Sequence, residues 1–295
     1  MKFDFAISKA RLNRQKVVVT SYSKSDNTVN LLDKRTGTVV DKVQVPYYQA
    51  TLQWNKSRDI FGTCGRKLNL FKCSEKKLIS VGSLMQSASK SIKTCGPITG
   101  MDWNHANSNI LATSCIDTTC TIWDAEVGKA VKQLIAHDCA VHDVSWDSTA
   151  NNFATVAKDG SIRCFDLRNL EHSSVIFEHS HSEPITRVEW NKLNTNYVAV
   201  TTENSIMVVD VRMPSFPASE VTFPEAEMTT IQWSSRSPSV LVSGGSDGKA
   251  LLWDFALDSQ QPIGQFAVKA SISDIHMSKN ECIISYDHYV KIVKI

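Results

Sequence analysis

A short segment that recurs about every 43 residues constrains the fold of this 295-residue chain more than any other feature. A typical copy has an apolar residue, two further residues, a second apolar residue, a polar residue and then a large side chain. A regular period of this length indicates that one supersecondary unit is repeated along the chain. The large side chains that end the copies are Trp54, Trp103, Trp146, Trp190, Trp233 and Met277, with spacings of 49, 43, 44, 43 and 44 residues.

A second signal follows each copy. It is a polar turn and then a run that alternates between apolar and polar residues, as at Asp159–Asp166 and Asp247–Asp254. Alternation with a period of two predicts β-strands. The Asp-Gly pairs predict hairpin turns, because the second turn residue needs a positive φ. Such turns begin at seven positions, namely 26, 65, 117, 159, 203, 247 and 287.

The period and the turns together predict the fold. A repeat of this length in which Trp-Asp closes a strand, as at Trp123 and Trp253, is typical of a WD-repeat β-propeller with four-stranded blades. We therefore predict an all-β fold, a single seven-bladed WD-repeat propeller over residues 1–295. The interval from 65 to 117 is the longest, and its surplus predicts a long inter-blade loop at about 74–96.

The two ends of the chain raise the question of how the ring closes. The last copy ends at a third strand, and Phe3–Ile7, Val17–Tyr22 and Val29–Asp33 are the expected inner strands of the first blade. We therefore expect 27 strands and a three-stranded last blade with an unpaired edge. A segment upstream of Met1 or an extended segment of a partner would complete that blade. The alternative is that residues 1–8 serve as its outer strand.

Composition excludes several classes of function. Lys and Arg number 32 and Asp and Glu 30. The resulting net charge of +2 does not indicate the basic surface with which proteins bind nucleic acid. No apolar run reaches the roughly 18 residues that a membrane span needs. The N-terminus lacks the apolar core of a secretory signal. We expect a cytoplasmic and nuclear protein that binds neither membranes nor nucleic acid.

The sequence also lacks the motifs of catalysis and metal binding. None of the eight cysteines forms a CxxC pair, and no Gly-rich phosphate loop or zinc-protease motif is present. We therefore expect no enzyme activity, no metal and no cofactor.

Several polar residues of the repeats have an expected structural role. His137 is expected to bond the turn residue Asp159 of its own blade, rather than to act in catalysis or bind a metal. Trp123 and Trp253 are expected to pack between blades, and Asp117 and Asp247 to begin turns.

The most specific runs are Ile116–Trp123 and Phe165–Ser173, supported by Val208–Pro214. With them the chain resembles the WD-repeat scaffold family typified by the plant transparent-testa-glabra and anthocyanin-regulator proteins, with an animal relative that binds DYRK-type kinases. The resemblance implies a non-catalytic scaffold that brings together protein kinases or transcription regulators, as a monomer within a larger complex.

Two copies of an Asp-x-Arg pattern fall 44 residues apart, in neighbouring blades: Asp166 with Arg168, and Asp210 with Arg212. Asp33-Lys34-Arg35 is a third copy. Receptors of cullin–RING ubiquitin ligases use such arginines to meet the ligase's propeller adaptor, so a substrate receptor of such a ligase is the alternative function. The competing interpretation is that the Asp holds its own turn and the Arg is only solvated.

Tyr47 and Tyr48 follow Pro46 in a loop where blade packing needs no aromatic pair. With the turns at 158–160, 203–204 and 247–248, they are expected to form one rim that takes a short segment of a partner. Packing of the two rings within the loop is the other interpretation.

Overall fold

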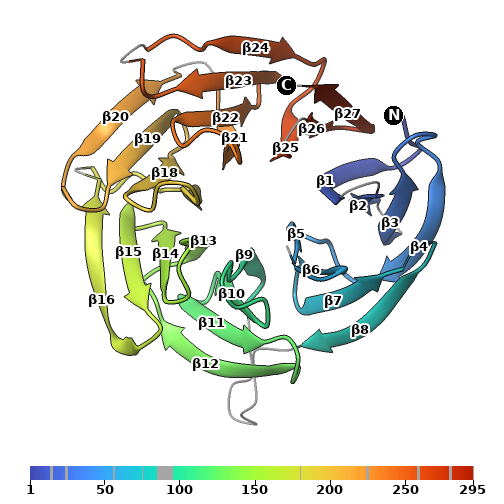
Figure 1. Ribbon diagram of the computed structural model, residues 1–295, viewed down its shortest axis with the longest axis horizontal. Helices are drawn as coiled ribbons and strands as arrows, with labels where there is room; N and C mark the ends of the chain where they lie inside the picture. Colours follow the sequence, from blue (N-terminus) through green and yellow to red (C-terminus); the bar gives the residue numbers. More distant parts are fainter. Residues whose placement is uncertain are drawn as a thin grey trace.

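The computed structural model describes residues 1–13, 16–23, 26–55, 57–74, 76–84, 96–179, 181–223, 226–257, 260–278 and 281–294. In these ranges, 27 strands form seven antiparallel sheets arranged as blades around a central axis (Figure 1). The all-β, seven-bladed propeller predicted from the repeat is therefore confirmed.

The blades follow one another along the chain. Blade 1 consists of β1 (Ala6–Asn13), β2 (Lys16–Tyr22), β3 (Asn27–Asp33) and β4 (Val39–Val45). Blade 2 consists of β5 (Thr51–Trp54), β6 (Ile60–Cys64), β7 (Leu68–Cys73) and β8 (Leu78–Leu84). Blade 3 consists of β9 (Ile98–Trp103), β10 (Ile110–Cys115), β11 (Thr119–Asp124) and β12 (Lys129–Ile135). Blade 4 consists of β13 (Val141–Trp146), β14 (Asn152–Ala157), β15 (Ser161–Asp166) and β16 (Asn169–Glu178).

The remaining blades have the same order from the centre outward. Blade 5 consists of β17 (Arg187–Trp190), β18 (Tyr197–Thr201), β19 (Ser205–Asp210) and β20 (Pro217–Thr222). Blade 6 consists of β21 (Met228–Trp233), β22 (Val240–Gly245), β23 (Lys249–Asp254) and β24 (Gly264–Ala267). Blade 7 consists of β25 (Ile272–Met277), β26 (Glu281–Tyr286) and β27 (Tyr289–Lys294).

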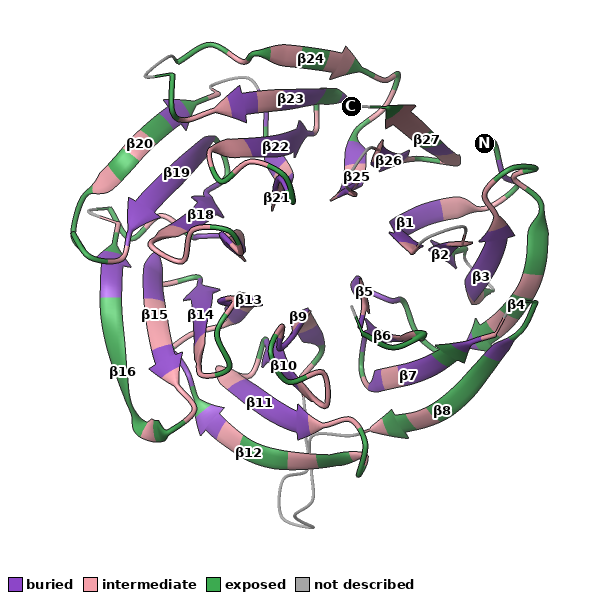
Figure 2. Cartoon of the chain, viewed as in Figure 1, coloured by how far each residue is buried: buried purple, intermediate pink, exposed green. Residues whose placement is uncertain are grey.

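Apolar side chains fill the space between neighbouring blades. Seven clusters of buried residues lie one at each interface of the ring. Between blades 4 and 5, for example, Ile162 and Phe177 lie in one cluster with Trp190 and Val200. Burial is concentrated on the inner strands, and the outermost strands are exposed along much of their length (Figure 2). Each blade therefore depends on its neighbours to cover its faces.

The last blade has three strands, as predicted, and the N-terminus begins a fourth. Lys2 forms an isolated antiparallel bridge with Tyr289. Met1 and Val290 exchange backbone hydrogen bonds of 2.7 and 3.0 Å. The predicted inner strand Phe3–Ile7 is therefore corrected: β1 begins at Ala6, because residues 1–3 follow β27 instead.

The expected inter-blade loop at 74–96 is also corrected, because it contains the strand β8. Leu78 is buried between blades 1 and 2, whereas Ile79 and Val81 are 50% and 54% exposed. The apolar residues of this edge strand therefore do not follow the alternation by which inner strands are recognised. The Ser and Lys residues around it suggest a loop, which is why the strand was not predicted. Residues 85–95 of the expected loop lie outside the described residues.

The turns between the second and third strands have the positive φ values that the Asp-Gly pairs predict. Gly160 and Gly248 have φ values of +74° and +78°. In the turn that Asp117 begins, Thr118 takes the same left-handed region with a φ of 76°, which is costly for a β-branched residue. The Asp117 carboxylate stabilises this turn, because it accepts the Thr119 hydroxyl at 2.6 Å.

His137 is fully buried and joins a turn to a strand. Its Nδ1 lies 3.0 Å from Oδ2 of Asp159, and its Nε2 lies 2.8 Å from Oγ1 of Thr155. Asp159 also accepts the Ser161 N–H at 3.0 Å. Burial lowers the pKa of His137, while Asp159 acts in the opposite direction. The imidazole thus fixes the turn as part of the fold.

Both tryptophans of the Trp-Asp pairs lie between blades. Trp123 donates its Nε1–H to Thr113 at 2.9 Å, and Trp253 donates to Ser243 at 3.0 Å. Their rings belong to the clusters at the interfaces of blades 2 and 3 and of blades 5 and 6. Asp247, by contrast, is exposed and accepts the Lys249 N–H at 3.0 Å.

A buried ionic cluster joins blade 1 to blade 7. Asp274 of β25 is 1% exposed and accepts hydrogen bonds from the Arg11 guanidinium and, at 3.4 Å, from Lys9 Nζ. Burial lowers the pKa of Arg11 to about 10 and lowers the pKa of Lys9 well below its ordinary value. Removal of Asp274 would leave two buried cations without this carboxylate.

We predict that Asp274→Ala lowers the free energy of unfolding by about 3–5 kcal/mol, because breaking a buried ion pair leaves an uncompensated charge. Glu126→Ala is the control, since Glu126 and Arg58 form an exposed pair at 3.8 Å. Such pairs contribute about 0–1 kcal/mol. Urea unfolding of both variants checks the prediction, and equal losses would contradict it.

A second prediction concerns pH. Because the folded-state pKa of His137 is lowered, the unfolded chain binds more protons below its ordinary value of about 6.5. Stability should therefore fall as the pH drops below that value. His137→Gln should fall less steeply between pH 7.5 and 5.5, whereas a variant at the exposed His172 should follow the parent chain. Urea midpoints at each pH measure this, and parallel curves for all three proteins would refute it.

Candidate functional site

The corners between third and fourth strands lie at one end of the propeller. Neighbouring strands are antiparallel, so the inner strands finish at this end too. At several corners an aspartate ends the third strand and its carboxylate accepts backbone N–H groups of the turn. The aspartate thus holds its own turn. This is what the structural interpretation of the Asp-x-Arg pattern requires. These residues are Asp33, Asp124, Asp166, Asp210 and Asp254.

At the corner of blade 4, Arg168 is folded back onto Asp166. Its Nε lies 3.0 Å from both carboxylate oxygens, and its Nη2 lies 2.5 Å from Oδ2. This bonding lowers the pKa of Asp166 and raises that of Arg168. The Arg168 side chain is nevertheless 71% exposed. The aspartate therefore fixes the plane of a guanidinium that still has donors for a partner.

The corner of blade 5 repeats this geometry. Arg212 Nε lies 3.0 Å from Oδ1 of Asp210, and its Nη2 lies 2.6 Å from Oδ2. The carboxylate of Asp210 is nearly buried, while the Arg212 side chain is 60% exposed. The structure thus places Arg168 and Arg212 in matching positions on adjacent blades.

The third Asp-x-Arg copy, in blade 1, differs. Asp33 accepts the backbone N–H of Arg35 at 2.7 Å, but no bond joins its carboxylate to the Arg35 guanidinium within the described part of the chain. Lys34 instead pairs with Glu281 of blade 7 at 2.6 Å. The fixed guanidinium is therefore a shared feature of blades 4 and 5.

Two large apolar side chains beside Arg212 were missed by the sequence analysis. Met213 and Phe216 are 72% and 80% exposed. Ser215 between them has a φ of 89°, and its N–H donates to Ile176 O of blade 4 at 3.2 Å. The sequence signal for this exposed surface is an aromatic residue between Pro214 and Pro217, because an aromatic side chain in such a turn has no core to pack into.

The opposite end of the propeller has the tyrosine pair. Tyr48 meets Tyr22 edge-on, with ring centroids 5.5 Å apart, and Arg66 lies 5.6 Å from the ring centroid of Tyr47. Tyr22 and Tyr48 are 44% and 50% exposed. Burial raises the pKa of Tyr48. Tyr48 therefore packs against β2 and Tyr47 lies beside the turn between β6 and β7, while both rings also offer surface to solvent.

The polar residue before the last residue of the repeated segment lines the central channel in five copies, whereas Ser145 in the copy of blade 4 is buried. A cavity of about 730 Å³ at one mouth of the channel is lined by Asp102, Glu189, Gln232 and His276, among others. Asp102 accepts a bond from Lys192 at 3.1 Å, and this lysine lowers its pKa although burial opposes the shift. The recurrent polar position in the repeat is the sequence signal for this lining.

The described residues offer two further observations. They include no helix that could cross a membrane, and no group of three or more His, Cys, Asp or Glu residues among them could hold a metal ion.

Comparisons with known proteins agree with the fold. Residues 52–149 match the model of the anaphase-promoting complex subunit 4 WD40 domain, and residues 220–254 match that of the WD domain, G-beta repeat. A DDB1- and CUL4-associated factor 7 homolog of Dictyostelium discoideum is 35% identical over 271 residues, which are 87% of this chain and 83% of the relative.

Two fungal proteins are also similar. A WD repeat-containing protein of Saccharomyces cerevisiae is 32% identical over 64% of this chain and 40% of the relative. An uncharacterized WD repeat-containing protein of Schizosaccharomyces pombe is 29% identical over 78% of this chain and 61% of the relative. The chain belongs to the WD-repeat family, whose propellers serve as protein-interaction scaffolds.

The geometry of the blade 5 corner assigns different roles to its two charged residues: Asp210 stabilises the fold, and Arg212 is available to a partner. We predict that Asp210→Ala lowers the free energy of unfolding by about 1–2 kcal/mol, because bonds to a nearly buried carboxylate are lost. Arg212→Ala should cost clearly less than Asp210→Ala, because the Arg212 side chain is largely exposed. Urea unfolding of each variant is the measurement, and a larger loss for the arginine variant would contradict this assignment.

Proposed function

We propose that this protein is a non-catalytic substrate receptor that binds the propeller adaptor of a cullin–RING ubiquitin ligase. The observation that carries the proposal is the matched pair of fixed guanidinium groups, Arg168 and Arg212, on adjacent blades. The similar protein of Dictyostelium discoideum is named for its association with DDB1 and CUL4. The cytoplasmic and nuclear location expected from the sequence is part of this proposal.

The chemistry of the two corners suits an acidic partner. A guanidinium whose plane is already fixed loses little side-chain freedom when it meets a carboxylate of the adaptor. Met213 and Phe216, exposed beside Arg212, supply apolar surface of the kind that anchors an interface. The partner surface should therefore combine carboxylates with an apolar hollow.

A second role is favoured by the aromatic surface at the opposite end. We propose that Tyr47 and Tyr48 contact a short segment of a protein kinase or a transcription regulator, which would make the protein a scaffold between this partner and the ligase. Exposed tyrosine rings beside an arginine are typical of interface anchors. The two ends would then bind different partners at the same time.

The test is co-precipitation of the adaptor with the full chain and with the double variant Arg168→Ala, Arg212→Ala. We expect the double variant to bind the adaptor at least about thirtyfold more weakly, because arginine hot spots commonly contribute about 1 kcal/mol or more each. The variant Arg168→Lys, Arg212→Lys keeps the charge without the planar fork, and it should recover an intermediate amount.

Two controls locate the effect. Arg236→Ala removes an exposed arginine at the same end of the propeller and should leave adaptor recovery unchanged. Tyr47→Ala with Tyr48→Ala should leave the adaptor bound but weaken capture of the kinase or regulator by about 1–3 kcal/mol. Equal recovery of adaptor by the parent chain and the double arginine variant, or none by either, would overturn the ligase proposal.

A further inference from the structure

A groove lies between blades 5 and 6, at the end of the propeller where the corners lie. It has a volume of about 290 Å³. Its lining combines aromatic and other apolar side chains with a few uncharged polar groups, and the described residues contribute no ionised side chain to it. Tyr197, Trp233, Pro238 and Phe255 are among the lining residues. An apolar cavity of roughly 150 Å³ holds a benzene-sized group, so this groove has room for one aromatic side chain.

The walls of the groove are held in place by hydrogen bonds between the segments that form them. Asn191 donates its side-chain amide to Pro238 O at 2.7 Å, across the gap between the two blades. The Phe255 N–H donates to Ser239 O at 3.0 Å, which joins the corner of blade 6 to its inner loop. Trp233 donates its Nε1–H to a backbone carbonyl of blade 5 at 2.9 Å. The groove is therefore already formed in the free chain, and filling it requires little ordering of these residues.

The groove adjoins the fixed guanidinium of Arg212. Tyr197 and Asp210 lie directly opposite each other in the ladder of β18 and β19, so their side chains share one face of blade 5. Tyr197 packs against the apolar cluster between blades 5 and 6, so this face is turned toward blade 6. Hydrogen bonding to Asp210 raises the pKa of Arg212, and the Tyr197 hydroxyl beside the guanidinium raises it further. Tyr197 therefore lines the groove and adjoins the guanidinium at its rim.

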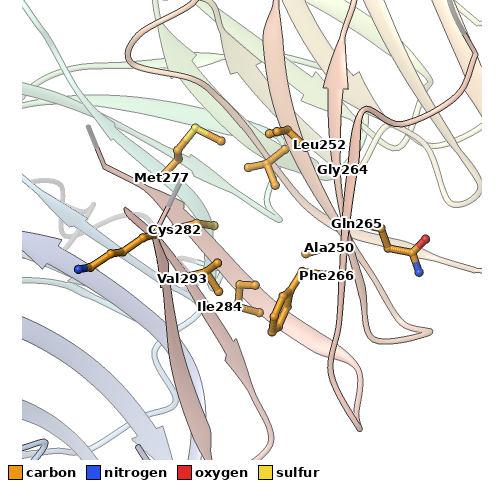
Figure 3. Close-up of a pocket in the computed structure, with 11 residues that line it drawn as sticks. Ala250, Leu252, Gly264, Gln265, Phe266, Met277, Cys282, Ile284 and Val293 are labelled. Atoms are coloured by element: carbon orange, nitrogen blue, oxygen red, sulfur yellow. The ribbon is translucent and has the colours of Figure 1, made fainter. Parts of the chain in front are cut away.

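A cavity between blades 6 and 7 differs from this groove in one respect. It has a volume of about 210 Å³ and is also lined mostly by apolar side chains, including Leu252, Phe266 and Met277 (Figure 3). Among the described residues, however, no arginine lines it. Binding sites are mostly apolar hollows in which a few placed polar groups set the orientation of the ligand. The groove between blades 5 and 6 has both features, because Arg212 stands at its rim.

The two features define the groups that a partner must present. A guanidinium with a fixed plane pairs with a carboxylate. The uncharged lining suits an aromatic ring, which would contact the rings of Tyr197, Trp233 and Phe255. Because Tyr197 adjoins both places, the two partner groups must lie within about two residues of each other, given that neighbouring Cα atoms are about 3.8 Å apart. The partner therefore needs an aromatic residue beside an acidic one.

We propose that the groove between blades 5 and 6 receives an aromatic side chain of the ligase adaptor, within two residues of the carboxylate that meets Arg212. This inference rests on the proposed function, because it assigns a further contact to the same interface. Burial of the ring supplies affinity, and the charge pair at the rim fixes the direction from which the adaptor approaches.

Variants that fill the groove test this proposal. Ala218 and Ala256 line the groove and are exposed, so Ala218→Trp and Ala256→Trp should fill it without disturbing the core. Each variant should bind the purified adaptor at least about tenfold more weakly, because the aromatic anchor is excluded. Isothermal titration calorimetry with the full chain measures the affinities. Affinities equal to that of the parent chain would overturn the proposal.

Two control variants separate the groove from the surface around it. Ala267→Trp adds the same side chain to an exposed position of blade 6 that does not line the groove. Gly264→Val narrows the cavity between blades 6 and 7, where the nearest atom would lie 3.6 Å from the new Cβ. Both controls should bind the adaptor as the parent chain does. If they weaken binding as much as Ala256→Trp, the loss does not belong to the groove and the proposal falls.

Coupling to Arg212 distinguishes this inference from the proposed function. If one segment of the adaptor carries both groups, Arg212→Ala combined with Ala256→Trp should lower the affinity by much less than the product of the two single losses. Losses that simply multiply would mean two unrelated contacts and would overturn this inference alone. If the parent chain binds no adaptor at all, both this inference and the proposed function are overturned.

A footprint of the complex identifies the occupant. Tyr197 and Phe255 are half-buried, and their oxidation by hydroxyl radicals should fall when the adaptor is bound, whereas that of Tyr48 at the opposite end should not change. Unchanged oxidation in a complex that still depends on Arg168 and Arg212 would overturn the groove contact and leave the ligase proposal standing. Protection that appears without adaptor and rises with the concentration of the chain would assign the groove to a second copy, which also overturns the proposal.

Discussion

Closure of the ring by the contact of blade 1 with blade 7 is the constraint on which the remaining structure depends. Each blade has two apolar faces, and seven interfaces cover them only if the first and last blades meet. Phe3, Ile7 and Val290 supply the apolar part of that contact, and Arg11 and Asp274 supply a buried ionic part. Burial of apolar surface is the dominant favourable contribution to such a contact, while a buried ion pair is costly to break once formed.

Much of the fold could be predicted from the sequence because spacing alone carries the information. The repeated tryptophans and the turns at seven positions determine the number of blades without any knowledge of contacts. The strand β8 was missed because Ile79 and Val81 are exposed at the rim, so the usual alternation is absent. The path of residues 1–3 was missed as well, because pairing with Tyr289 depends on where the ring closes and not on local sequence.

The candidate site was predictable in position but not in geometry. The Asp-x-Arg pattern is visible in three blades, yet the guanidinium bonds its own aspartate at Arg168 and Arg212 and not at Arg35. The two interpretations offered by the sequence prove compatible, because one carboxylate both holds the turn and orients the arginine. Exposure of Phe216 could not be read from the sequence either, since it depends on the path of a corner in which Ser215 has a left-handed φ of 89°.

The pairing of Met1–Phe3 with residues 288–290 has a consequence for synthesis of the chain. Blades 2 to 6 each gain a covered face as the next blade emerges from the ribosome, whereas Ile7, Leu12 and Val17 of blade 1 wait for Ile283 and Val290. At a translation rate of about 5–20 residues per second, this apolar face stays uncovered for on the order of 15–60 s. The first blade to be made is therefore the last to be protected from aggregation, and a nascent chain of this kind has the greatest need of a chaperone at its N-terminal blade.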